Sequence, residues 1–158
     1  MKKILITMLV GALPAFSSFT FAQEMTGQSS NPEQASNRLE ARLSPVIAVD
    51  ASGQARLDIE AGVRNDRFTA EVEIAKDDFG RLGITPGNGF RDEVVELHVL
   101  RGGTVIFSHA LQFSRNLAND ITFETDIRGA AAPELQAGDV ARVNVNGHFT
   151  LRGRFVIR

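Results

Sequence analysis

Cysteine, tryptophan and tyrosine are all absent from this chain of 158 residues. Without cysteine there is no disulfide, no thiol nucleophile and no thiolate metal site, so the core alone must hold the fold. Without tryptophan and tyrosine the chain lacks the aromatic girdles of an outer-membrane barrel and the residues that dominate antibody-like binding loops. Phenylalanine is the remaining aromatic residue, and burial predicts core positions for Phe68, Phe79, Phe90, Phe107, Phe113, Phe123, Phe149 and Phe155.

An excess of basic residues is also missing. Lysine and arginine number 17 against 19 aspartates and glutamates, a net charge of −2. If Lys2 and Lys3 are removed with a signal peptide, 15 basic residues remain and the net charge falls to about −4. This mildly acidic, interspersed balance predicts solubility and argues against a nucleic-acid surface, which needs a clustered basic patch.

The chain begins with the features of a secretory signal peptide. Lys2 and Lys3 precede the apolar run 4–16, and the small residue Ala22 precedes Gln23. A charged start, a short apolar run and a small residue at the cut predict export with cleavage after Ala22. The run is shorter than the ~20 apolar residues of a spanning helix, so no membrane span is expected.

A polar segment follows the predicted cleavage site. Residues 23–37 are rich in Gln, Ser and Asn and show no apolar periodicity, while 38–42 add at most a helical turn. We therefore expect three parts: a signal peptide over 1–22, a flexible leader over 23–42 and a single domain over 43–158.

From residue 43 onward the apolar residues alternate with polar ones, which is typical of half-buried strands. The pattern predicts strands at 46–50, 54–62, 67–75, 93–100, 104–113, 120–128, 139–146 and 149–157. Turn residues separate many of them, and no helix of two turns is indicated outside the signal peptide. The predicted fold is an all-β, antiparallel β-sandwich of about eight strands, immunoglobulin-like or related.

Two connections make more specific predictions. Residues 76–92 form a long loop whose four apolar side chains are expected to cover one end of the core: Phe79, Leu82, Ile84 and Phe90. The turn at 146–148 is predicted as a three-residue loop that pairs Val145 with Phe149 and Val143 with Leu151, because that register keeps apolar residues on one face.

A candidate metal site comes from the hairpin around Gly102 and Gly103. With a two-residue turn, Glu96 faces His109 and His98 faces Phe107, so Glu96, His98 and His109 share one face. Two imidazoles and a carboxylate suit zinc or another divalent ion. The apolar residues on the same face argue for a packed surface instead, and a register slip of one residue would separate the ligands.

Other chemistry finds little support. No Gly-x-Ser-x-Gly elbow and no glycine-rich phosphate loop before a helix occurs, so we expect no enzyme activity and no cofactor. The leading hypothesis is an exported binding or accessory module, in the periplasm or outside the cell, whose partner is a protein or envelope component. Two alternatives stay open: a structural subunit of a surface or envelope assembly, and a metal-binding protein that uses the two-histidine site.

Overall fold

The computed structural model describes residues 37–60 and 65–158. The predicted signal peptide, residues 23–36 of the leader and residues 61–62 of one predicted strand lie outside this range. The strands are β1 (Asn37–Pro45), β2 (Ala51–Ile59), β3 (Arg67–Ala75), β4 (Val95–Arg101), β5 (Thr104–Asn116), β6 (Asp120–Arg128), β7 (Val140–Val145), β8 (His148–Arg154) and β9 (Val156–Ile157). Within these two ranges, helix is limited to η1 (Lys76–Asp78), α1 (Phe79–Leu82), η2 (Asn88–Phe90) and η3 (Gly129–Ala131).

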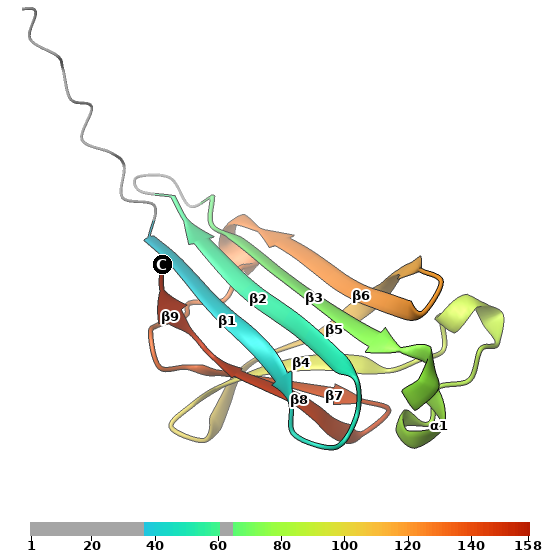
Figure 1. The fold of residues 1–158 in the computed structure, drawn as a ribbon. Coiled ribbons are helices and arrows are strands. Elements are labelled where there is room, and N and C mark those ends of the chain that lie inside the picture. The colour runs from blue at the N-terminus through green and yellow to red at the C-terminus, as the bar shows by residue number, and fades with distance from the viewer. Residues whose placement is uncertain (1–36, 61–64) are drawn as a thin grey trace, which may run out of the picture. The chain divides into compact units, whose positions relative to one another are not determined.

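The strands form one closed antiparallel sheet. Their order is β2-β3-β6-β5-β4-β7-β8-β1, and β1 pairs again with β2 to close an eight-stranded barrel, with β9 added beside β1 (Figure 1). The all-β, antiparallel prediction is confirmed. The sandwich is not, because closure joins what would be two separate sheets.

Two strands make the closure possible by passing from one half of the barrel to the other. The first half of β5 pairs with β4, and its second half, from Gln112, pairs with β6. β1 pairs with β2 along its length and then meets β8 at Ser44 and Pro45. Gly153 permits that last approach, since a Cβ there would overlap the carbonyl oxygen of Arg42.

The barrel interior is a packed apolar core. Inward residues alternate with outward ones, as in β3, where Phe68, Val72 and Ile74 are fully buried. Phe123 of β6 and Phe155 after β8 are at most 1% exposed. Phe107 and Phe113 are half-buried and pack against this core. Among the described phenylalanines the exception to the prediction is Phe149, which is half-buried on the outside of the barrel.

The first strand differs from the prediction. Residues 46–50 are a connection, and the strand occupies Asn37–Pro45, so residues 37–42 belong to the fold and not to a leader. Leu39, Ala41 and Leu43 point inward from β1. The spacing of Leu39 and Leu43 also fits one helical turn, which hides the alternation in so short a segment.

The long loop covers the end of the core, as predicted. Phe79, Leu82, Ile84 and Phe90 are each at most 8% exposed. Phe79 and Phe90 meet edge to face with ring centroids 5.5 Å apart, and α1 forms one helical turn within this loop. None of the helices in the described ranges has the length and apolar character needed to cross a membrane.

The β7–β8 turn corrects one predicted register. Asn146 and Gly147 form a two-residue turn with φ of 47° and 83°, and Asn144 pairs with Phe149. The predicted Val143–Leu151 pair is nevertheless present, because a bulge at Thr150 shifts the register by one residue. The bulge turns the Thr150 side chain inward, where its hydroxyl donates to the His148 carbonyl over 2.8 Å.

Candidate functional site

The predicted metal ligands do not come together. A bulge at Ile106 shifts the β4–β5 register, so His109 pairs with Leu97, and Ser108 takes the place opposite His98. Leu97 faces the core, and His109 therefore lies on the opposite side of the sheet from Glu96 and His98. Among the described residues no group of three histidine, aspartate or glutamate side chains is arranged to hold a metal ion.

The same register brings a serine to His98. Ser108 Oγ lies 2.7 Å from His98 Nδ1, and Glu96 Oε2 lies 3.6 Å from His98 Nε2. The three side chains line neither of the two grooves described below. The contact with Ser108 holds the His98 ring in position on the outer surface of the sheet.

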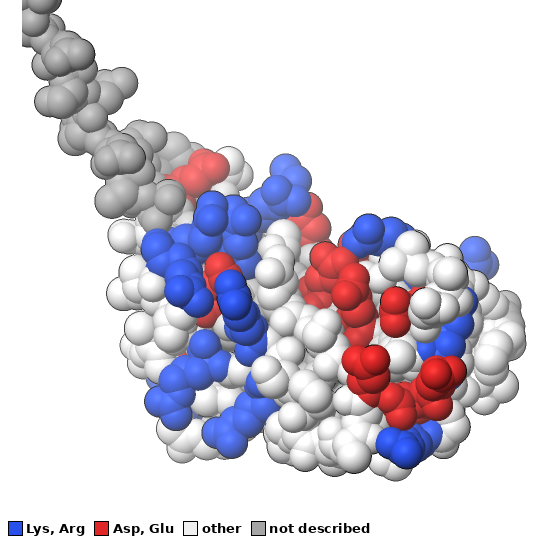
Figure 2. Space-filling view, viewed as in Figure 1, with Lys and Arg blue, Asp and Glu red and all other residues white. Residues whose placement is uncertain are grey.

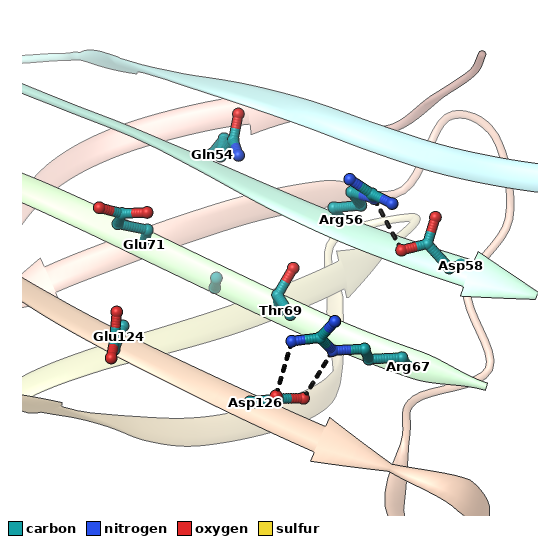
Figure 3. A pocket seen from close by; sticks show the side chains of 9 residues that line it. Gln54, Arg56, Asp58, Arg67, Thr69, Glu71, Glu124 and Asp126 are labelled. Atoms are coloured by element: carbon teal, nitrogen blue, oxygen red, sulfur yellow. Dashed lines mark hydrogen bonds and ion pairs between the residues drawn. The ribbon is translucent and has the colours of Figure 1, made fainter. Parts of the chain in front are cut away.

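Charged side chains gather in two places on the outside of the barrel. The first, here the ion-paired face, covers β2, β3 and β6 and includes Gln54, Arg56, Asp58, Arg67, Thr69, Glu71, Glu124 and Asp126 (Figure 3). These side chains line a shallow groove of about 330 Å³. The strand register places these side chains beside one another: Arg56 of β2 stands opposite Thr69 of β3, and Thr69 stands opposite Asp126 of β6.

Arginines of the ion-paired face are matched by carboxylates. Arg67 binds Asp126 with two hydrogen bonds of 3.0 and 2.8 Å, and Arg128 approaches the same carboxylate at 3.1 Å. Arg56 and Arg38 bracket Asp58 at 2.7 and 2.8 Å. The arginines of this face are therefore neutralised within the fold, and the acidic side chains Glu71 and Glu124 stand opposite each other.

The pKa values of the bridging carboxylates follow from this pairing. Hydrogen bonds from Arg67 and then Arg128 hold the pKa of Asp126 well below its usual range. For Asp58, burial pushes the pKa upward, but hydrogen bonds from Arg56 and Arg38 outweigh it and the pKa is lowered. Both carboxylates are therefore charged at any physiological pH.

The second place, here the arginine groove, lies on the outside of β7 and β8. It has a volume of about 470 Å³ and is lined by Leu100, Gly102, Gly103, Gly138, Val140, Arg142, Phe149, Arg152 and Arg154. Arg142 stands directly opposite Arg152, and Arg154 lies two residues further along β8 opposite Val140. In the described ranges no carboxylate lies within ion-pair distance of these three guanidinium groups.

Arg142 is held in position from two sides. Its guanidinium carbon lies 4.2 Å from the centre of the Phe149 ring, a cation–π contact. Its Nε donates to Asn144 Oδ1 over 3.1 Å. The half-buried Phe149 thus orients an arginine, and the terminal nitrogens of Arg142 remain available to a ligand.

A buried ion pair supports the loop at the edge of the arginine groove. Asp139, next to Gly138, is 2% exposed and binds Arg101 with two hydrogen bonds of 2.9 and 2.8 Å. The same carboxylate accepts the Gln136 N–H over 2.9 Å, and Arg101 donates to the Glu134 carbonyl. Hydrogen bonding to Arg101 lowers the pKa of Asp139 despite its burial.

The charge distribution is uneven on the face of the molecule that Figure 2 shows. In Figure 2 basic side chains gather over the half of the view that holds β1, β8 and β9, and acidic ones over the other half. Like charges directly opposite each other destabilise a sheet, so the Arg142–Arg152 pair carries a cost that no carboxylate among the described residues offsets. Such local conflicts concentrate at functional sites.

Sequence reasoning missed this groove, although a signal for it existed. The predicted Val143–Leu151 pairing already places Arg142 opposite Arg152, and Arg154 follows at the same-face spacing of two. The overall net charge of −2 obscured the cluster, because it averages the ion-paired face with the arginine groove.

Comparison with known proteins assigns no family to the chain, since no family model and no curated protein matches it.

Proposed function

We propose that this chain is an exported, non-catalytic binding module that recognises an anionic envelope component through the arginine groove. The observation that carries the proposal is the cluster of Arg142, Arg152 and Arg154 without a carboxylate partner among the described residues. Arginine is the side chain best suited to carboxylate and phosphate groups, because its planar fork donates in pairs.

Export is part of the proposal and rests on the sequence of residues 1–22. Mass spectrometry of the protein from the periplasm or the medium should find Gln23 at the mature N-terminus. A mature protein that still begins at Met1 would contradict export by this route.

Binding is tested by co-sedimentation with the envelope fraction of the source cell. Wild-type protein should sediment, and more should be released as salt rises. The triple variant R142Q/R152Q/R154Q should stay in the supernatant. The charge-matched variant R67Q/R115Q/R128Q, which alters arginines that have carboxylate partners, should still sediment. Equal loss in both variants would reject the arginine groove as the binding surface.

A second candidate function is a structural subunit joined by strand addition. Its support is the first half of β5: residues 104–111 pair with β4 on one edge, and no described residue pairs with the other. The segment 104–110 carries no charged residue, and Val105 and Ile106 are 52% and 40% exposed. Such an edge can accept a further strand.

Size-exclusion chromatography coupled to light scattering separates the two candidates. A binding module should remain a monomer over a wide concentration range. A structural subunit should form a ladder of oligomers, and Val105→Lys should suppress it by placing a charge beside the open edge.

A further inference from the structure

We infer that the arginine groove binds a phosphomonoester group in its dianionic form. This inference rests on the proposed function and narrows it to one ligand chemistry. Three features of the groove support it: the number of unneutralised charges, the contacts that hold Arg142, and the open side of the groove.

The charge count favours a dianion over a monoanion. Arg142, Arg152 and Arg154 bring three positive charges to one face. A carboxylate offers one charge and two oxygens, whereas a phosphomonoester carries close to two charges and three terminal acceptor oxygens above its second pKa of about 6. The phosphomonoester therefore offsets more of the repulsion between Arg142 and Arg152.

The strand geometry suits a group of that size. Paired residues on neighbouring strands stand roughly 5 Å apart, so the guanidinium groups of Arg142 and Arg152 can contact different oxygens of one tetrahedral anion. Phe149 and Asn144 already fix Arg142, which lowers the entropic cost of binding. Arg154, roughly 7 Å further along β8, can reach a third oxygen.

The rest of the ligand has room on the glycine side of the groove. A Cβ placed on Gly102, Gly103 or Gly138 would meet no atom within 4 Å, so this wall is open. His98 of β4 stands opposite Arg142 of β7, and its Nδ1 lies 2.7 Å from Ser108 Oγ. The carboxylate of Glu96, two residues before His98 on β4, lies 3.6 Å from His98 Nε2.

The test compares methyl phosphate, dimethyl phosphate and acetate at pH 8 and constant ionic strength, with amide chemical shifts of the purified protein as the readout. Methyl phosphate is a dianion at this pH, and the other two are monoanions. We expect methyl phosphate to shift amides of 140–142 and 152–154 at a concentration at least tenfold below that needed by the monoanions. R142Q, R152Q and R154Q should each weaken binding roughly tenfold, and R128Q should not.

The possible results separate this inference from the proposed function. Equal binding of all three anions in the groove overturns the phosphomonoester assignment and leaves anion recognition standing. No shift in the groove with any anion overturns both. Phosphatidylcholine vesicles doped with phosphatidic acid or with phosphatidylglycerol identify the source of the phosphomonoester. If only the vesicles with phosphatidic acid retain the protein, and R142Q abolishes this retention, the ligand is a lipid headgroup. If methyl phosphate binds but neither kind of vesicle retains the protein, the ligand is a soluble phosphomonoester.

Discussion

Arginine performs opposite tasks on two outer faces of the same barrel. On the ion-paired face Arg67 and Arg128 converge on Asp126, and Arg56 and Arg38 converge on Asp58. In the arginine groove Arg142 faces another arginine and stacks on Phe149. In the first arrangement the arginine charges are neutralised by carboxylates of the same face. In the second the arginine charges are left without such a neighbour among the described residues.

The difference shows that the net charge of the chain is a poor guide to the charge of any one face. Both faces are made of strands in which every second side chain points outward. On each face two arginines stand opposite each other, Arg67 opposite Arg128 and Arg142 opposite Arg152. What separates the faces is the nearest carboxylate: Asp126 of β6 binds both Arg67 and Arg128, whereas β8 carries no acidic residue. The presence of a carboxylate beside the pair therefore decides whether the arginines are neutralised.

Both faces enclose the same apolar core, and the loss of a core side chain should have the largest effect. Phe123→Ala should lower the free energy of unfolding by about 3–5 kcal/mol, because the ring is 1% exposed beneath the ion-paired face. Glu124→Ala, the next residue on the outer side, should cost less than about 1 kcal/mol. Denaturant unfolding monitored by circular dichroism measures both. Equal small losses would mean that β6 does not bury Phe123.

The sequence predicted most of the strands because alternation is a local property. β3 and β6 occur at the predicted bounds of 67–75 and 120–128. The prediction that the long loop covers the core was also correct. Four apolar side chains in an irregular segment are buried most readily against the end of the core. Barrel closure depends on β1 meeting β8, a contact between distant segments that alternation does not encode.

A single bulge explains why the three predicted metal ligands lie apart. One extra residue, Ile106, moves His109 to the other side of the sheet and Ser108 to His98. The apolar run Val105, Ile106 and Phe107 departs from strict alternation and is the only local sign of it. A metal site drawn across two strands requires an exact register, whereas the fold class does not.

A smaller effect tests the ion pair that supports the edge of the arginine groove. Asp139→Asn should cost roughly 1–3 kcal/mol, less than for a fully buried pair because Arg101 is 41% exposed. The folded-state pKa of Asp139 is lowered, so its stabilisation is present above the unfolded value near 3.8 and is lost as the pH falls through the folded value.

Thermal unfolding from pH 7 to pH 2 measures this dependence. The difference between wild type and Asp139→Asn should stay constant down to about pH 4 and shrink below it. Glu134→Gln, in the same loop, is the control and should change little, because the 134 position contributes its backbone carbonyl. A difference that persists at pH 2 would show that the carboxylate charge is not the cause.

The smallest effect contrasts one arginine from each face. Arg67→Gln removes two hydrogen bonds to Asp126 and should lower the melting temperature slightly. Arg152→Gln removes a like charge opposite Arg142 and should leave the melting temperature unchanged or raise it. High salt should shrink both differences, since both side chains are exposed. If Arg152→Gln lowered the melting temperature as much as Arg67→Gln, Arg152 would have a stabilising role, and the contrast between arginines paired with carboxylates and the arginines of the groove would fail.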